Sequence, residues 1–311
     1  MRIVSVVWLM CVLCVGVAQA AERETYPARP IRLLIPFAPG GATDIVGRIL
    51  APKLMERLGG QQIVVDNRPG AAGNIAVEIV GTAQPDGYTL LVGNISTNSI
   101  NPILFKSKAV DAPRDLTGIT LLASIPNLIL IGPQVPANTL KEAIAYAKTR
   151  PGQLNFSAPL GSYSHLDMLA LTAAAGIKMV HVPSKGAGET VTSLLRGEIH
   201  ITESNVASNI GAIRGGKVKA VAVTAAQRIP ELPDVPTLSE LGFKGIGSLN
   251  WNGLFAPTKT PKAAIDKLFN ATAAILKDPE MQDFMAKRSI PVAVSASPQD
   301  FNAYVHSEMQ R

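Results

Sequence analysis

The sequence has 311 residues, a formal net charge of +6 and only 5% aromatic residues. Its basic residues are dispersed, with no Lys/Arg-rich run and no interleaved aromatics, which argues against a nucleic-acid-binding protein and leaves at most a mild attraction for anions. Both cysteines, Cys11 and Cys14, fall in an N-terminal apolar segment, so the rest of the chain can form no disulfide.

That N-terminal segment has the pattern of a secretory signal peptide. Arg2 precedes an apolar run from Ile3 to Val17, and an exit of small residues ends at Ala20. The run is shorter than the roughly 20 residues that a membrane-spanning helix needs. We therefore expect cleavage after Ala20 (signal peptide, residues 1–20) and a periplasmic chain long enough for two lobes.

Three units in the first half of the chain share one design, an apolar strand that leads into a loop of small and polar residues. The strands are predicted over 31–37, 63–65 and 88–92. The loops that follow them are predicted over 38–43, 66–74 and 93–98. A helical apolar repeat follows the first two loops, and the first of these helices is expected to begin at Asp44.

The second half repeats the design. Strands are predicted over 154–157, 179–182, 199–202 and 218–223, and the helices after the first three of them end at Ala175, Arg196 and Arg214. Residues 128–131 and 249–255 are expected to carry the chain between lobes, and proline-initiated helices are expected over 261–276 and 279–287. This alternation predicts two α/β lobes with mainly parallel sheets flanked by helices, lobe 1 over 21–126 plus 227–311 and lobe 2 over 127–226.

Motifs for catalysis and for metals are absent from the sequence. There is no GxSxG elbow and no P-loop, and adjacency of Ser162 and Ser164 to His165 is no evidence for a catalytic pair. The four histidines are widely spaced, without an HxH or HExxH motif or a thiol cluster. We expect no catalytic residues, no metal site and no cofactor.

The first glycine loop does not fit a nucleotide either. A dinucleotide fold needs GxGxxG after its first strand, whereas Gly40 and Gly41 are followed only by Gly47. Asp66, after the second strand, is a weak counterpart of the acid that binds ribose. We therefore assign these glycines a different role.

Small polar residues at so many strand exits favour a site for a carboxylate. Ligands of open α/β sheets bind beyond the carboxyl ends of the strands, where helix N-termini offer unpaired N–H groups and about half a positive charge each. Helix capping has the same geometry, so Thr43 or Asp44, Asn74 and Ser162 are also cap candidates. A carboxylate at Asp44 would repel an anion at contact, so we expect it to start the helix or to accept from a ligand ammonium or a water.

From about Tyr26 onward the chain resembles the Bug-type periplasmic solute receptors of tripartite tricarboxylate transporters. The motifs that carry this resemblance are YPARPIRLLIPFAPGGATD (26–44), VVDNRPGAAGNIA (64–76), DGYTLLVGN (86–94), NFSAPLGSYSHL (155–166), HVPSKGAGETVTSLLRGEI (181–199), AVAVTAAQRIPELPDVPTLSELGF (220–243) and WNGLFAPTKTP (251–261).

This resemblance implies a type II periplasmic-binding fold, in which two lobes close on a ligand, and it implies no enzyme activity. It implies a small organic carboxylate as ligand, membrane permease subunits as partners, and a monomer. Two alternatives stay open. The same module could report its ligand to a signalling partner, and a hydrolase could use the region of Ser162 and His165.

Matching positions imply ligand contacts in both lobes. In the first lobe they are Ala38, Pro39, Gly41, Asp44, Gly70, Ala71, Ala72, Gly73, Asn74, Ser96, Thr97 and Asn98. In the second lobe they are Ser157, Gly161, Ser162, His165, Pro183, Lys185, Gly186 and Asn205. The chain departs from the family pattern at Ser184, Leu169 and Ser204, where tyrosine, glutamate and aspartate are common. The first change could widen the pocket, and the other two remove acids.

Overall fold

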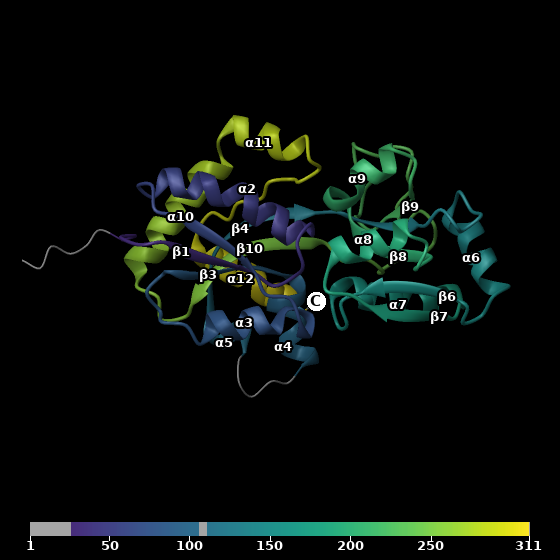
Figure 1. The fold of residues 1–311 in the computed structure, drawn as a ribbon, viewed down its shortest axis with the longest axis horizontal. Coiled ribbons are helices and arrows are strands. Elements are labelled where there is room, and N and C mark those ends of the chain that lie inside the picture. Colours follow the sequence, from purple (N-terminus) through teal and green to yellow (C-terminus); the bar gives the residue numbers. More distant parts are fainter. Residues whose placement is uncertain (1–25, 106–110, 311) are drawn as a thin grey trace, which may run out of the picture.

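The computed structural model describes residues 26–105 and 111–310, so the predicted signal segment and both cysteines lie outside the described residues. The described chain forms two α/β lobes that lie side by side, as the sequence predicts (Figure 1). Within these ranges no helix combines the length and the apolar character that crossing a membrane would require.

Lobe 1 is built on a five-stranded sheet in the order β2-β1-β3-β10-β4. Its strands are β1 (Ile31–Ile35), β2 (Ile63–Asn67), β3 (Thr89–Asn94), β4 (Leu116–Ile125) and β10 (Asn250–Pro257). Its α-helices are α2 (Ala42–Arg57), α3 (Asn74–Gly81), α4 (Asn101–Leu104), α5 (Ala112–Asp115), α10 (Lys262–Leu276), α11 (Pro279–Ala286) and α12 (Pro298–Gln310). Two single turns of other helix types are η1 (Ala71–Gly73) and η2 (Ser96–Ile100).

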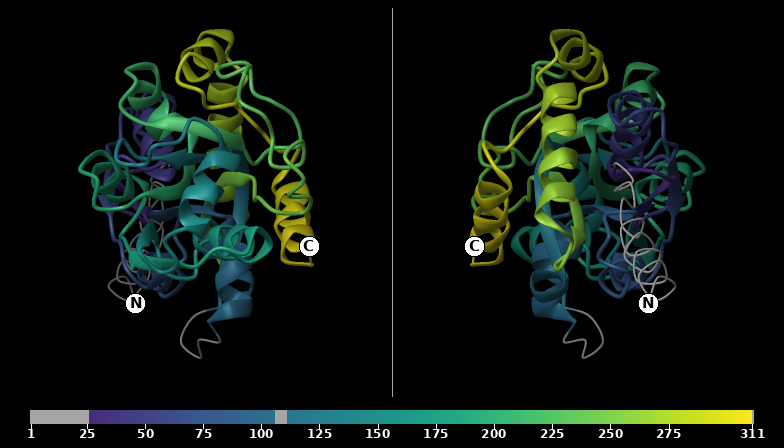
Figure 2. Two further views of the ribbon diagram at one scale, coloured as in Figure 1. Left: turned by 90° about the vertical axis from the view of Figure 1, so that its right-hand side faces the viewer. Right: turned by 90° about the vertical axis from the view of Figure 1, so that its left-hand side faces the viewer.

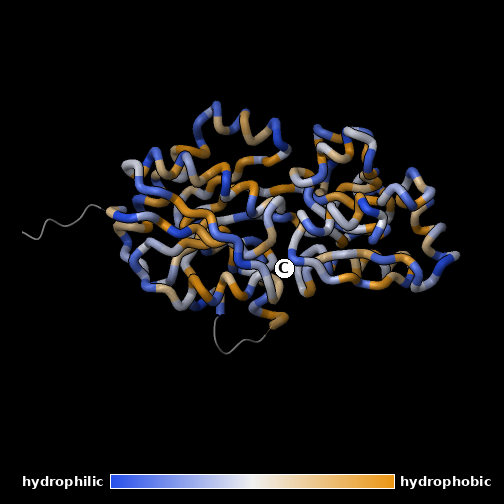
Figure 3. The backbone as a smooth tube through the Cα atoms, in the orientation of Figure 1, coloured by the Kyte–Doolittle hydropathy of each residue, from blue (hydrophilic) through white to orange (hydrophobic). Residues whose placement is uncertain are grey.

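Both faces of this sheet are covered, which explains why β1 is an almost continuous apolar run. Alternate side chains point to opposite faces, so Leu33 packs with α2 and α10 whereas Leu34 packs with α3 and α12. Figure 2 shows the helices of the C-terminal part of the chain, in yellow-green and yellow, along the sides of this lobe. Figure 3 shows the hydrophobic segments of the chain concentrated in the strands inside it.

Lobe 2 contains a three-stranded sheet in the order β8-β5-β9 and the pair β6-β7. Its strands are β5 (Asn127–Ile131), β6 (Leu154–Ala158), β7 (Met179–Pro183), β8 (Ile201–Asn205) and β9 (Lys219–Val223). Its helices are α6 (Leu140–Lys148), α7 (Tyr163–Ala175), α8 (Ala187–Leu195) and α9 (Val206–Arg214). A separate apolar cluster around Phe156, Leu140 and Leu171 forms its core.

Parallel pairing is confined to the repeating strand–helix units. The pairs β1–β2, β1–β3 and β6–β7 are parallel, as expected. The strands through which the chain passes between the lobes behave differently, because β10 is antiparallel to β3 and β4, and β5 is antiparallel to β8 and β9. A strand that begins at the cleft is antiparallel to strands whose carboxyl ends lie at the cleft.

The segment between β9 and β10 packs on lobe 2. The amide of Leu238 donates to the carbonyl of Val223, and Phe243 and Ile246 pack on the lobe-2 core. Residues 227–249 were expected in lobe 1. We propose to divide the chain so that it returns to lobe 1 at Asn250, since Pro236 and Leu238 both form backbone bonds with Val223 of β9.

Two helix starts differ from the predicted caps, while a third agrees. Gly41 caps α2, so Thr43 and Asp44 lie in the first turn, and Gly73 caps α3, so Asn74 is already helical. Gly73 has φ 94°, and an added Cβ there would overlap the side chain of Thr97, which explains glycine at that position. Ser162 caps α7 as predicted, and its Oγ accepts from the amide of His165 at 3.4 Å.

Gly253 in β10 lies against the buried ring of Phe301 from α12, and an added Cβ would overlap that ring. We expect Gly253→Ala to lower the free energy of unfolding by about 1–3 kcal/mol, because the aromatic cluster of Phe301, Trp251 and Phe255 must shift. Urea denaturation measures this change.

The matched control is Gly211→Ala in α9, where an added Cβ meets open space. This variant should keep or gain stability, by up to about 1 kcal/mol from helix propensity. Equal losses in both variants would contradict close packing at Gly253.

Candidate functional site

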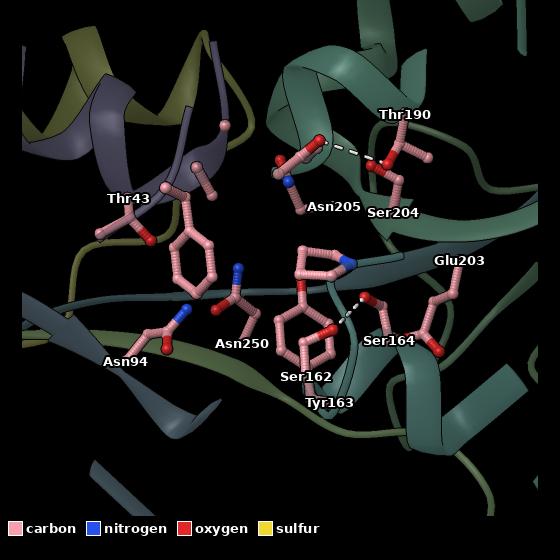
Figure 4. A pocket seen from close by; sticks show the side chains of 16 residues that line it. Thr43, Asn94, Ser162, Tyr163, Ser164, Thr190, Glu203, Ser204, Asn205 and Asn250 are labelled. Carbon is pink, nitrogen blue, oxygen red and sulfur yellow. Dashed lines mark hydrogen bonds between the residues drawn. The ribbon is translucent and has the colours of Figure 1, made fainter. Parts of the chain in front are cut away.

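A polar cavity of about 40 Å³ lies between the lobes, at the carboxyl ends of β3 and β8 (Figure 4). Both lobes line it with uncharged polar and small residues and one acid: Phe37, Gly41, Ala42, Thr43, Asn94, Pro159, Ser162, Tyr163, Ser164, Gly186, Ala187, Thr190, Glu203, Ser204, Asn205 and Asn250. A single water needs roughly 10–15 Å³ on this scale. The cavity as it stands therefore suits a few waters, and a larger ligand requires the lobes to part.

Three hydrogen bonds join the lobes around this cavity. The amide of Ala38 donates to the carbonyl of Lys185 at 3.0 Å, and the amide of Tyr163 donates to Ser96 Oγ at 3.1 Å. Ser208 Oγ donates to the carbonyl of Gly40 at 2.9 Å. Each such bond contributes about 1 kcal/mol net.

The N-termini of α2 and α8 meet across the cavity. A Cβ placed on Gly41 would lie 3.8 Å from the backbone nitrogen of Ala187, so the two helix starts have room for little more than one side-chain carbon between them. Gly186 precedes α8 with φ 151°, a conformation that side chains rarely adopt. First-turn N–H groups have no acceptor within their own helix, and two converging helix dipoles favour an anion here.

Asp44 supports the first of these helix starts from below. Its carboxylate accepts from the amide of Gly40 at 2.9 Å, from Asn67 Nδ2 at 2.9 Å and from Arg48 Nε at 2.9 Å. Asp44 is buried but does not line the cavity. These donors fix the glycine loop and neutralise an acid that would otherwise oppose an anionic ligand.

Two further helices of lobe 2 begin at the cavity. Asn205 caps α9 by accepting from the amide of Ser208 at 2.9 Å, and Ser162 caps α7. The hydroxyls of Ser162 and Ser164 lie 3.1 Å apart (Figure 4). The cap atoms and the hydroxyl pair together give the cavity a wall of donors and acceptors without a basic side chain.

The structure places the twenty candidate residues in three groups. Four line the cavity: Gly41, Ser162, Gly186 and Asn205. Five make contacts between the lobes beside it: Ala38, Pro39, Ser96, Gly161 and Lys185. The others lie behind these residues or away from the cavity: Asp44, Gly70, Ala71, Ala72, Gly73, Asn74, Thr97, Asn98, Ser157, His165 and Pro183.

The residues of the third group have structural partners. Thr97 donates to Asn98 and bonds Asn94, which lines the cavity, and Asn74 accepts from Asn101. The carbonyl of Ser157 accepts from Thr202. These contacts hold the loops that carry the lining residues.

His165 faces away from the nearby hydroxyls. Its Nδ1 accepts from the amide of Gly161 at 3.1 Å, and its ring lies 4.1 Å from the ring of His181. The hydrogen bond from His165 to Ser162 is donated by the backbone amide, not by the imidazole. Burial, and then the neighbouring His181, lower the pKa of His165.

The three positions that depart from the family pattern lie at different distances from the cavity. Ser204 lines the cavity and accepts from Asn209 Nδ2 at 2.9 Å, whereas Leu169 is exposed on α7. Ser184 bonds the hydroxyl of Thr190, which lines the cavity, at 2.9 Å. Serine in place of tyrosine at position 184 thus leaves a small hydroxyl behind the wall.

Several lining residues were not among the candidates. Ala42 and Thr43 follow from the start of α2, and Asn94, Ser164 and Ser204 stand at strand exits that the sequence had marked. Asn250 lies in a crossing strand, and its position in the cavity depends on pairing with β4. Glu203 directly follows the strand predicted over 199–202, and no ligand contact was predicted for it.

Glu203 is the one acidic side chain among the lining residues and is 2% exposed. Neither of its carboxyl oxygens has a hydrogen-bond partner of good geometry among the described residues. Burial raises the pKa of Glu203 well above its ordinary value, and the neighbouring carboxyl of Asp167 raises it further, while Asn127 opposes the shift. Burial therefore favours the protonated form of Glu203 in the unliganded protein.

This raised pKa makes stability depend on pH. The folded state retains a proton that the unfolded state loses above its pKa of about 4.5, so Glu203 lowers stability as the pH rises from there to the folded pKa. We expect the difference between Glu203→Gln and wild type to grow by up to about 1.4 kcal/mol per pH unit in favour of the variant. Urea denaturation at several pH values measures it, and a difference independent of pH would contradict the assignment.

Sequence comparison relates the chain to a known family of receptors. Residues 46–311 match the model of the tripartite tricarboxylate transporter family receptor. The chain is 32% identical to the protein BugT of Bordetella pertussis over 315 aligned residues, which cover 100% of this chain and 95% of BugT. It is 33% identical to a second protein of the same organism, one of the UPF0065 proteins, over 311 residues, which cover 100% of this chain and 94% of that protein.

Solved structures agree. The periplasmic binding protein BugD is 34% identical with a TM-score of 0.87, covering 92% of this chain and 95% of BugD. Rpa4515 of R. palustris with adipate is 31% identical with a TM-score of 0.87, covering 92% and 95%. MatC from Rhodopseudomonas palustris with bound malate is 32% identical with a TM-score of 0.86, covering 92% and 98%. The chain belongs to the tripartite tricarboxylate transporter receptor family, the Bug-type solute receptors.

Proposed function

We propose that this protein is a periplasmic receptor that binds a small organic carboxylate between its lobes and delivers it to a tripartite tricarboxylate-type membrane transporter. The observation that carries the proposal is the meeting of the α2 and α8 N-termini across a cavity without basic side chains. Two helix starts can neutralise a carboxylate with backbone N–H groups and need no arginine.

The relatives support the ligand class. Rpa4515 was solved with adipate and MatC with malate, and both share more than 30% of their residues with this chain. The signal-like N-terminus supports export to the periplasm. Delivery to a permease, rather than to a signalling partner, rests on the family to which the chain belongs.

Binding is expected to close the lobes in a hinge motion. Only a few hydrogen bonds join the lobes beside the cavity, so a ligand that bonds both walls adds free energy selectively to the closed state. A carboxylate held by N–H groups from α2 and α8 would make such contacts in that state alone.

Ligand binding should raise thermal stability. A ligand that binds only the folded protein adds about 2.7 kcal/mol at a hundredfold excess over its Kd. We expect a panel of carboxylates to contain compounds that raise the Tm, while sugars and inorganic cations leave it unchanged. The measurement is a thermal shift on the mature chain, and the opposite pattern would refute carboxylate binding.

Gly188→Ala tests whether closure is required. A Cβ at Gly188 would overlap the carbonyl oxygen of Pro39 in the other lobe, while alanine suits the first turn of α8. We expect carboxylate affinity to fall about tenfold or more, which corresponds to about 1.4 kcal/mol, with the folded state intact. Calorimetry measures the affinity and small-angle scattering the opening.

Gly211→Ala in α9 is the control, because its added Cβ meets open space in the same lobe. It should bind carboxylates like wild type. Unchanged affinity in Gly188→Ala would mean that the ligand is held without the contact between Pro39 and α8.

A further inference from the structure

One end of the cavity is acidic, and its acid has no counter-charge. Figure 4 shows Thr43 of α2 on one side of the cavity and Glu203, beside Ser164, on the opposite side. The lining residues include no lysine, arginine or histidine. The cavity therefore offers helix N-termini at one side and a buried carboxyl group at the other.

Contacts around Glu203 indicate what this end can bind. The carboxyl oxygens of Glu203 and the Oδ1 atom of Asn250 are buried acceptors with no hydrogen bond of good geometry among the described residues, although Asn127 lies close enough to lower the pKa of Glu203. Both residues line the cavity. Buried acceptors left without donors cost about 1–3 kcal/mol each, so a ligand group that donates hydrogen bonds is favoured beside them.

Charge disfavours a second carboxylate at this end. Asp167 lies close enough to Glu203 to interact with it, and Asp167 itself accepts from the amide of Ser248 at 2.7 Å and from Ser248 Oγ at 3.1 Å. A ligand carboxylate would bring a further acidic group beside Glu203 and Asp167, would meet no cation among the lining residues, and could accept only the single O–H of a protonated Glu203. An ammonium group carries three donors, no acceptor and the opposite charge.

We propose that Glu203 is a specificity-determining residue that receives an ammonium group, so that the preferred ligand is an amino carboxylate rather than a dicarboxylate. This inference rests on the proposed function, because it takes the ligand carboxylate to lie at the starts of α2 and α8. An amino carboxylate then has its carboxylate at the starts of α2 and α8 and its ammonium group at Glu203.

Ammonium binding would release a proton to solvent. The protonated carboxyl of Glu203 becomes a carboxylate that pairs with the ligand ammonium, and no other bond changes. Burial raises the pKa of Glu203 and an ammonium lowers it again, so the affinity of an amino carboxylate rises with pH. The described titratable groups that interact with Glu203 are Asp167 and Tyr163, both on α7, and burial raises the pKa of Tyr163 well above its ordinary range.

The experiment compares matched ligands by calorimetry. β-Alanine, 4-aminobutyrate and 5-aminopentanoate are each titrated against the dicarboxylate of the same carbon count (malonate, succinate and glutarate), and L-alanine is titrated against L-lactate. We expect an amino compound to bind wild type about tenfold more tightly than its partner. Its affinity should rise by up to about tenfold per pH unit below the pKa of Glu203.

Glu203→Gln keeps the size and one acceptor but removes the charge. It should lose the preference for amino compounds and their pH dependence, while Glu198→Gln, on the exposed surface of the same lobe, should behave as wild type. A wild-type preference for dicarboxylates, or a preference for amino compounds that survives in Glu203→Gln, would overturn the inference alone. If no carboxylate of either kind binds wild type, the proposed function fails.

Discussion

The candidate site depends on one constraint. The first-turn N–H groups of α2 and α8, which belong to different lobes, must face the same cavity. Hydrogen bonds within α2 and α8 cannot use these groups, and the cavity brings both sets together at Gly41 and Ala187. A Cβ on Gly186 or Gly188 would press against residues 37–39 of the other lobe, which explains glycine at these two positions. The strand–loop–helix units of both lobes can be understood as the framework that delivers these helix starts to one place.

The strands that connect the lobes also contribute to the cavity. Because β10 is antiparallel to β3 and β4, it brings Asn250 to the cavity while the adjacent Trp251 is locked in the lobe-1 core among Phe255, Phe301 and Tyr304. One strand thus joins a rigid aromatic cluster directly to the ligand-facing wall. Each lobe also has an apolar cluster of its own, around Phe156 in lobe 2 and around Trp251 in lobe 1, while a third cluster includes residues of both lobes.

Local sequence patterns and the family resemblance identified the repeating strand–helix units but not all the elements that pack against them. The apolar run of β1, the Ser162 cap and the end of α9 at Arg214 follow from nearby residues. By contrast β4, α6 and α12 were not anticipated, and our proposal to place residues 227–249 with lobe 2 rests on backbone bonds of Pro236 and Leu238 to Val223 of β9. Candidate residues taken from loops mostly form the support of the cavity, because a loop position alone does not say which side chain faces the ligand.

The two acids near the ligand show why partners, rather than residue type, decide function. Asp44 stood out in the sequence beside the glycine loop as a possible acceptor for an ammonium, yet its oxygens already accept from Gly40, Asn67 and Arg48. Glu203 sits inside a fully buried strand, where an acid is costly unless paired. An acid whose oxygens all accept well-formed hydrogen bonds holds its loop, whereas an acid with no hydrogen bond of good geometry can still gain free energy from a ligand.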